Sequence, residues 1–343
     1  MKKIKRENLK NLYELISSNQ RLYIPCKSAG QTNYAIYGTD SVVDLDTLKT
    51  VKSAKEIFFP QSETIYTVVK EDKKYKVTQQ ELENESFVLF GVRGCDMKGV
   101  QVLDKVFLSE PIDTFYKARR DHGIIVTLCC NEPEESCFCT SFGIDPTAPE
   151  GDVEAVFSGD SLYLKANTEK GENLLSACAS VLEDADETEA DSEKENIKAI
   201  LKKLPYADLS LEGWDGKATE EKFNSTVWDE IYKPCLACGT CTFVCPTCQC
   251  YDIKDYDTGK GIQRYRCWDS CMYSDFTMMA HGNNRTSQKQ RFRQRFMHKL
   301  VYFPANNDGM YSCVGCGRCV DKCPASTNIV KVIKAFSKEV NSK

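Results

Sequence analysis

A repeated cysteine spacing constrains this chain more than any other feature. Residues 235–246 read CLACGTCTFVCP and residues 313–324 read CVGCGRCVDKCP, so the pattern C-x2-C-x2-C-x3-C-P occurs twice. Bacterial ferredoxins hold four-iron, four-sulfur clusters with this spacing. Three closely spaced cysteines wrap around one face of a cubane, and the fourth cysteine ligates the other cluster. The repeat therefore predicts a pair of [4Fe–4S] clusters that exchange one ligand each.

Each predicted cluster takes three cysteines from one motif and one from the other. The expected ligands of the first cluster are Cys235, Cys238, Cys241 and Cys323. Those of the second cluster are Cys313, Cys316, Cys319 and Cys245. Intervening glycines (Gly239, Gly315, Gly317) let backbone amides approach the sulfurs. Structural zinc is the alternative, but zinc prefers two separated C-x2-C pairs around one ion. The doubled triple spacing therefore favours iron–sulfur clusters.

Composition limits the class of protein. Nineteen cysteines in 343 residues are too widely spread for a disulfide-stapled miniprotein, and clustered cysteines in a reducing cytosol are metal ligands more often than disulfides. The net charge of −5 argues against general nucleic-acid binding, which needs a basic surface. No apolar run approaches the roughly 18 residues of a membrane span. Polar residues interrupt the lysine-rich start, so we expect no signal peptide and a cytoplasmic location.

The first half of the chain has the pattern of an α/β domain. Phe87–Val92 and Gly123–Leu128 are apolar runs typical of buried strands, and residues 95–107 between them have helical spacing. A strand, a helix and a second strand predict a parallel βαβ unit. The acidic segment Glu183–Glu195 is expected to be a solvated linker or an exposed helix start. We therefore predict a mixed α/β domain over 1–190 and a mostly helical, ferredoxin-like dicluster domain over 191–343.

Four cysteines of the N-terminal half form a candidate third site. Cys95 and Cys130 follow the two predicted strands, and Cys137 and Cys139 lie in the next loop. Neighbouring parallel strands would bring the first two to one edge of the sheet, where ligands gather in α/β folds. Asp96 could cap the helix that follows Cys95, whose positive end would favour an anionic cluster. The alternative is that Cys95 and Cys130 are small buried core residues.

The remaining features near the motifs leave alternatives open. Four further cysteines could bind another metal, with or without His281, or could pack as buried thiols: Cys248, Cys250, Cys267 and Cys271. The basic segment Arg285–Lys299 is expected to be a helix. Its charges either form a solvated face, or raise the potentials of the clusters and dock an acidic partner.

Several segments together resemble a known family. GVRGCDMKGVQVLDKVF, CNEPEESCFC, CLACGTCTFVCPTCQCYD, RCWDSCM and CVGCGRCVDKCP occur in this order. The chain is similar to the dicluster iron–sulfur subunits of anaerobic enzymes, such as the sulfhydrogenase beta subunit or the iron–sulfur subunit of anaerobic sulfite reductase. The resemblance implies a third iron–sulfur cluster at Cys95, Cys130, Cys137 and Cys139. It leaves a metal site open at Cys248, Cys250 and Cys271, and its pattern includes neither Cys129 nor Cys267.

The resemblance also implies partners. It predicts an electron-relay subunit beside a flavoprotein that binds FAD and NAD(P)H, with a separate catalytic subunit or a ferredoxin. The chain has no nucleotide-binding glycine loop and only three histidines, so it offers no evident catalytic set of its own. The alternatives are a reductase subunit whose N-terminal metal site acts directly on a small sulfur substrate, and a protein whose clusters are structural only.

Overall fold

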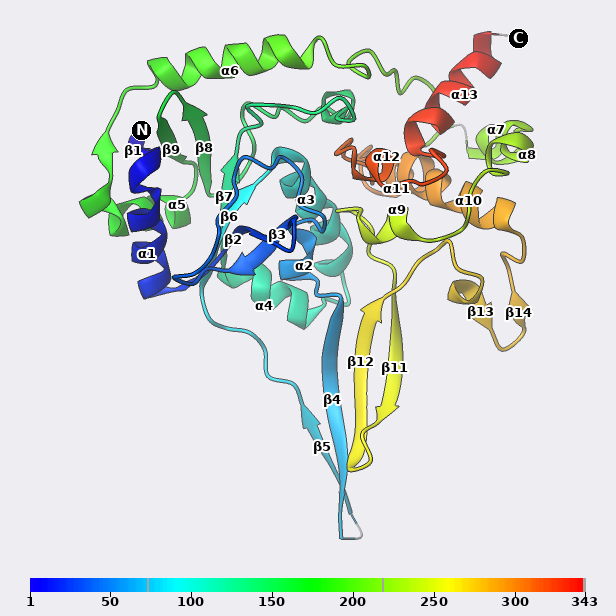
Figure 1. Cartoon of the computed structure of the whole chain (residues 1–343). Helices are drawn as coiled ribbons and strands as arrows, with labels where there is room; N and C mark the ends of the chain where they lie inside the picture. Colours follow the sequence, from blue (N-terminus) through cyan, green and yellow to red (C-terminus); the bar gives the residue numbers. More distant parts are fainter. Residues whose placement is uncertain (73, 218, 342–343) are drawn as a thin grey trace.

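A twisted eight-stranded sheet organises the N-terminal part of the protein (Figure 1). The structure, a computed structural model, describes residues 1–72, 74–217 and 219–341. The strand order is β10-β1-β9-β8-β7-β6-β2-β3. The strands are β1 (Lys2–Lys5), β2 (Arg21–Ser28), β3 (Gln31–Ile36), β6 (Phe87–Val92), β7 (Gly123–Leu128), β8 (Val153–Ser158), β9 (Ser161–Ala166) and β10 (Glu183–Asp184).

The four central strands run parallel. β2 pairs with β6, β6 with β7 and β7 with β8, all in parallel register. All six residues of β6 are buried, as expected for a strand covered on both faces. The crossover from β6 to β7 contains α3 (Gly94–Phe107) and α4 (Thr114–His122). The predicted parallel βαβ unit is therefore confirmed.

Helices from both halves of the chain cover this sheet. α1 (Leu9–Asn19) and α5 (Glu169–Ala177) contribute to one apolar core, and α2 (Lys55–Phe58) packs with α3 and α4. α6 (Thr188–Leu201) begins inside the acidic segment, so this segment is in part the start of a helix. Ala190 and Ile197 of α6 pack beside Val156 and Tyr163 of the sheet. The position chosen as the domain boundary thus falls within a helix that packs on the N-terminal sheet.

A second sheet projects from the body as an arm made of β4 (Ser62–Glu71), β5 (Lys74–Gln79), β11 (Tyr251–Asp257) and β12 (Gly261–Trp268) (Figure 1). Its order is β11-β12-β4-β5, and β12 pairs antiparallel with β4, nearly 200 residues earlier in the chain. Glu63 of β4 forms buried ion pairs with Arg119 and with Arg266, and its carboxylate lies 2.6 Å from the Arg266 guanidinium. Since two long strands come from residues 251–268, the prediction of a mostly helical C-terminal domain is not confirmed.

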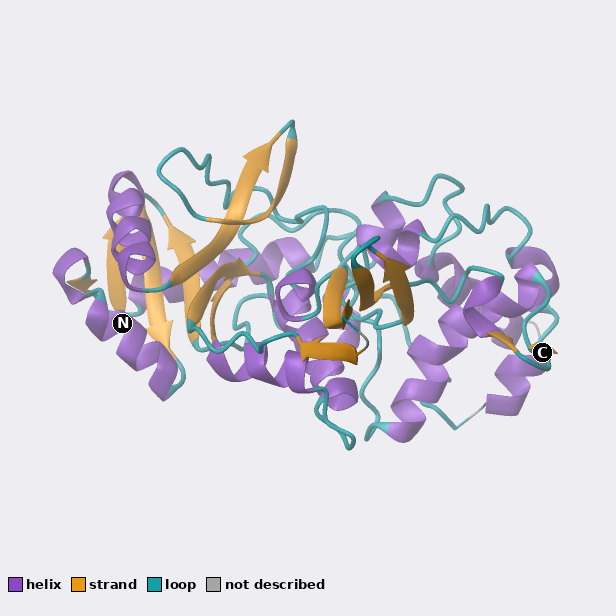
Figure 2. Ribbon diagram, turned by 90° about the horizontal axis from the view of Figure 1, so that it is seen from below, coloured by secondary structure: helices purple, strands orange, loops and turns teal. Residues whose placement is uncertain are grey.

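Helices gather at the end of the molecule where the C-terminus lies (Figure 2). Trp228, Phe292, Phe296 and Phe336 are buried together and form the centre of a second core. The elements are α7 (Thr219–Asn224), α8 (Val227–Ile231), α9 (Thr240–Phe243), β13 (Met278–Met279), β14 (Gly282–Asn283), α10 (Gln288–Met297), α11 (Phe303–Asn306), α12 (Arg318–Asp321) and α13 (Ile329–Asn341). A π-helical segment, His298–Tyr302, joins α10 to α11. Among the described residues, no helix combines the length and apolar character that crossing a bilayer requires.

Candidate iron–sulfur sites

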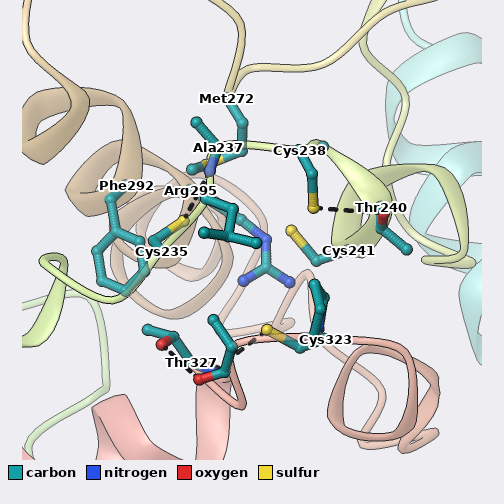
Figure 3. A pocket seen from close by; sticks show the side chains of 14 residues that line it. Cys235, Ala237, Cys238, Thr240, Cys241, Met272, Phe292, Arg295, Cys323 and Thr327 are labelled. Carbon is teal, nitrogen blue, oxygen red and sulfur yellow. Dashed lines mark hydrogen bonds between the residues drawn. The ribbon is translucent and has the colours of Figure 1, made fainter.

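The first site is a cavity lined by Cys235, Cys238, Cys241 and Cys323 (Figure 3). The first three come from the loop before α9 and from α9 itself, and Cys323 comes from the end of the second motif. Their sulfurs face one central space, into which the guanidinium of Arg295 extends. Backbone amides point at two of the sulfurs, from Ala237 to Cys235 at 3.4 Å and from Thr327 to Cys323 at 3.2 Å. The structure thus brings together the four cysteines predicted for the first cluster.

The second site groups Cys313, Cys316, Cys319 and Cys245. Burial raises the pKa of Cys316 to about 12, and the nearby sulfurs of Cys245 and Cys319 act in the same direction. The pKa of Cys313 is also raised by burial, again with Cys319 and Cys245 as neighbours. Cys245 therefore lies with the second motif and Cys323 with the first. This grouping places each fourth cysteine where the predicted ligand exchange requires it.

The third site is a cavity lined by Cys95, Cys130, Cys137 and Cys139. Cys95 opens α3 after β6, and Cys130 follows β7, so the two strands bring these residues to one edge of the sheet. Burial raises the pKa of Cys130 to about 11 and that of Cys95 well above its usual value. A metal or cluster binds cysteine as the thiolate, so binding at this site would release these protons. By contrast, the Cys129 thiol donates a hydrogen bond to Thr147 O at 3.3 Å and does not line this cavity.

The second and third sites share a wall. Gly315 and Cys316 of the second motif line the third cavity. Gly315 adopts φ +59°, and its backbone passes so close to the 136–139 loop that a Cβ there would lie 2.4 Å from Phe138 O. The Phe138 amide in turn donates to Gly315 O at 2.9 Å. Glycine is required here for both conformation and space.

A buried ion pair crosses the same contact. Arg318 donates to both oxygens of Asp96, at 2.6 and 2.8 Å, and also to Thr50 O at 2.9 Å. The expectation that Asp96 caps α3 is therefore wrong. The N-cap residue is Arg93, which makes no side-chain cap bond, and the Asp96 carboxylate is drawn away to Arg318.

Cys248, Cys250 and Cys271 lie near one another beside the second site. A Cys250–Cys271 hydrogen bond lowers the pKa of Cys250, and a Cys245–Cys248 hydrogen bond lowers that of Cys245. Lys55 is buried next to them and donates to Cys248 O at 2.9 Å. Their predicted companions lie elsewhere, since Cys267 sits on β12 opposite Asp252 and His281 is exposed.

The donor sets can be tested against the group that they would hold. Within the described ranges, no group of three or more Cys, His, Asp or Glu side chains is arranged to hold a single metal ion. One tetrahedral zinc with 2.3 Å bonds would draw its sulfurs to about 3.8 Å from each other. In a cubane each cysteine binds a different iron, so the sulfurs lie farther apart. Cavities lined by four cysteines each at the first and third sites fit cubane clusters better than a single ion.

Comparisons with known proteins agree with this chemistry. Residues 234–327 match the 4Fe-4S dicluster domain family, so the C-terminal part is a dicluster iron–sulfur domain. Subunit beta of sulfhydrogenase 2 from Pyrococcus furiosus is 30% identical over 337 residues, 96% of each chain. The chain therefore belongs to the dicluster iron–sulfur beta-subunit family. No solved structure is significantly similar to it.

The sequence left open whether the cations of the basic segment are solvated or lie near the clusters, and the structure buries two of them. Arg295 and Lys299 belong to the basic segment, for which a solvated face was one alternative, yet both are only 3% exposed. The signal was available, because Phe292, Phe296 and Leu300 alternate with these cations at helical spacing and mark a buried face. Arg318, inside the second motif, gave no such signal.

Proposed function

We propose that this chain is an electron-relay subunit of a multi-subunit oxidoreductase, with [4Fe–4S] clusters at all three sites. When bound, such clusters would supply one-electron redox chemistry. The observation that carries the proposal is the contiguity of the cysteine sets. Cys245 of the first motif lies in the second site, and Cys323 of the second motif lies in the first site. Gly315 and Cys316 of the second motif line the third site. The order third, second, first then follows from the packing.

The first site is the proposed end of the relay that faces a partner. Cys238 is the one exposed cysteine among the twelve, and Leu236 beside it is 67% exposed. The cysteines of the third site are largely buried. An electron carrier that docks over Cys238 therefore comes nearer to the first site than to the others. The proposed partners are a flavoprotein that binds FAD and NAD(P)H and a catalytic subunit or ferredoxin, and the similarity to a sulfhydrogenase subunit supports membership of a multi-subunit complex.

Iron and acid-labile sulfide content of the anaerobically purified chain tests the number of clusters. We expect about 12 irons per chain, whereas about 8 would remove the third cluster. Cys137→Ser is expected to lose about 4 irons. The matched control is Cys178→Ser, a cysteine buried in the N-terminal core away from every site, which should keep the full iron content. Subunits that copurify with the chain test the proposed partners.

A second function has one observation in its favour. A cavity of about 540 Å³ lies beside the third site and shares Pro146 and Leu201 with its wall. Lys198, Lys202 and Asp145 also line it, so a small anionic sulfur compound could bind there. This candidate predicts that the isolated chain reduces such a compound with an artificial electron donor. Absence of turnover, with full iron content, leaves the relay as the function.

The metal predicted at Cys248, Cys250 and Cys271 is a separate proposal, and it requires these side chains to move, because the described residues hold no ready three-ligand site for a single ion. A bound metal there would add to the iron, or to another metal, beyond the amount of the three sites. Whole-metal analysis of Cys250→Ser against the unsubstituted chain tests it. An unchanged metal content would assign these three cysteines to packing.

A further inference from the structure

A buried arginine without an acidic partner lies in the first site. Arg295 is 3% exposed, and its Nε has no hydrogen-bond partner. Among the described residues, no carboxylate lies within ion-pair distance of its guanidinium, which instead extends between the sulfurs of Cys235, Cys241 and Cys323 (Figure 3). A buried charge is stable only when another group compensates it. The ring of Phe296, whose centroid lies 4.5 Å from the guanidinium carbon, offsets part of this cost, and the negative charge that would offset the rest is that of the site.

The electrostatic neighbours of Arg295 are cysteines of both motifs. Burial acts to lower the pKa of Arg295, but the sulfurs of Cys241 and Cys319 outweigh it and the pKa is raised. Cys241 belongs to the first site and Cys319 to the second. The guanidinium thus lies against the first site on the side that faces the second.

Lys299 occupies the equivalent position at the second site, one helical turn later. Its Nζ lies 3.3 Å from Cys245 Sγ and donates to Thr247 Oγ1 at 2.8 Å and to Ser312 O at 2.9 Å. The π-helical segment His298–Tyr302 contains it, and π-bulges occur often at functional sites. One helix therefore directs one cation to each site of the pair.

Two of the three cations that line the third cavity pair with carboxylates, whereas Arg93 donates to the backbone carbonyls of Cys129 at 2.6 Å and Leu45 at 2.7 Å. Lys49 pairs with Glu134 at 2.7 Å and with Asp321 at 2.5 Å, and Arg318 pairs with Asp96. These charges therefore contribute little net positive potential to their surroundings. Within the described part of the chain, Arg295 and Lys299 differ from Lys49 and Arg318 because they have no carboxylate partner, and their neighbours are sulfurs of the first two sites and of Cys248.

We propose that Arg295 is a positioning residue that compensates the charge of the first cluster and raises its reduction potential. This inference rests on the proposed function. Reduction adds one electron, and therefore one negative charge, to a cluster in a water-poor cavity. A fixed cation nearby stabilises the reduced form more than the oxidised form. Lys299 acts on the second cluster in the same way, so the pair accepts electrons more readily than its thiolates alone would allow.

Redox titration of the anaerobic chain with dithionite, followed by electron paramagnetic resonance, tests the inference. In Arg295→Met we expect the ratio of reduced to oxidised first cluster, at a fixed solution potential, to fall about tenfold, a midpoint shift of about 59 mV for one electron. Arg295→Lys keeps the charge and should shift the midpoint by less than half as much. Arg295→Gln, which removes the charge but keeps hydrogen-bond donors, replaces the methionine variant if that variant loses iron.

Arg293→Met is the matched control. Arg293 lies on the same helix but stacks on Phe223 at 3.5 Å and donates to Phe223 O, away from the sites. It should leave every midpoint unchanged. Midpoints that do not move in Arg295→Met, or that move equally in Arg295→Lys, would overturn the inference. Either result counts only for a chain that has its full iron content and is reduced reversibly. If the proposed function fails, iron or reversible reduction is missing instead, so the two failures can be distinguished.

Discussion

Replacing Asp96 by asparagine tests whether the ion pair between the second and third sites stabilises the protein. Asp96 is 2% exposed and Arg318 is 3% exposed. The carboxylate accepts two hydrogen bonds from the guanidinium, at 2.6 and 2.8 Å. The substitution keeps the side-chain volume, removes the negative charge and replaces one accepting oxygen by an NH2 group, so one of the two hydrogen bonds from Arg318 is also lost. Arg318 then remains buried with Thr50 as its other partner.

The expected loss follows from this burial. Two unit charges about 4 Å apart attract by about 4 kcal/mol at an effective dielectric constant of 20. Removing one partner of a buried pair typically costs about 3–5 kcal/mol, because the other charge is left uncompensated. At about 2.1 cal/mol/K per residue, 343 residues give an unfolding entropy of about 0.7 kcal/mol/K. The loss then corresponds to a fall in Tm of about 4–7 °C.

Thermal unfolding of the anaerobic protein, followed by far-ultraviolet circular dichroism at one scan rate, measures this fall. Asp255→Asn is the matched control, since Asp255 also binds an arginine through two hydrogen bonds, of 2.7 and 2.6 Å, but on the exposed surface of the arm. Its Tm should stay close to that of the unsubstituted protein. A Tm of Asp96→Asn that matches the control would refute the reasoning.

Three other substitutions have expected outcomes. Gly315→Ala should lower the iron content, because its Cβ would collide with Phe138 O, whereas Gly309→Ala, with φ +79° and open space around it, should keep the iron. Trp228→Ala should lower the free energy of unfolding by about 3–5 kcal/mol in urea titrations, since the ring is 1% exposed. Glu63→Gln should cost a similar 3–5 kcal/mol, because it leaves two buried arginines without their shared carboxylate, and limited proteolysis should then cleave the arm faster. An unchanged iron content in Gly315→Ala, an unchanged unfolding free energy in Trp228→Ala or an unchanged cleavage rate in Glu63→Gln would contradict the corresponding expectation.

The sequence predicted those elements whose signal is local. The apolar runs of β6 and β7 and the helix between them carry their own patterns, and the parallel pairing followed from the length of the crossover. The grouping of Cys245 with the second motif and of Cys323 with the first followed from a spacing that one cluster geometry explains. In both cases a short stretch of residues contains the whole physical reason.

The arm could not be predicted, because its cause is not local. β11 reads YDIKDYD, which is rich in acids, and pairs through β12 with β4 almost 200 residues away. The pairing is fixed at its base by Glu63, Arg119 and Arg266, which come from three distant segments. Charged residues in a sequence normally indicate a surface, so nothing in the local pattern marks these three as buried partners.

The placement of the second motif gives its glycines a role beyond that of a cluster loop. In the first motif, Gly239 needs a positive φ and space beside the ring of Tyr273, both within the C-terminal part. In the second motif, Gly315 and Gly317 instead meet the backbone of Phe138 and Ser136, which belong to the third site. Gly317 occupies the position of Gly239 in the repeat, whereas Gly315 occupies that of Ala237, so the contact with the 136–139 loop adds a constraint that the repeat does not show. Since the second motif touches both other sites, any relay through this chain must pass beside it, and its backbone leaves no room for a side chain at that contact.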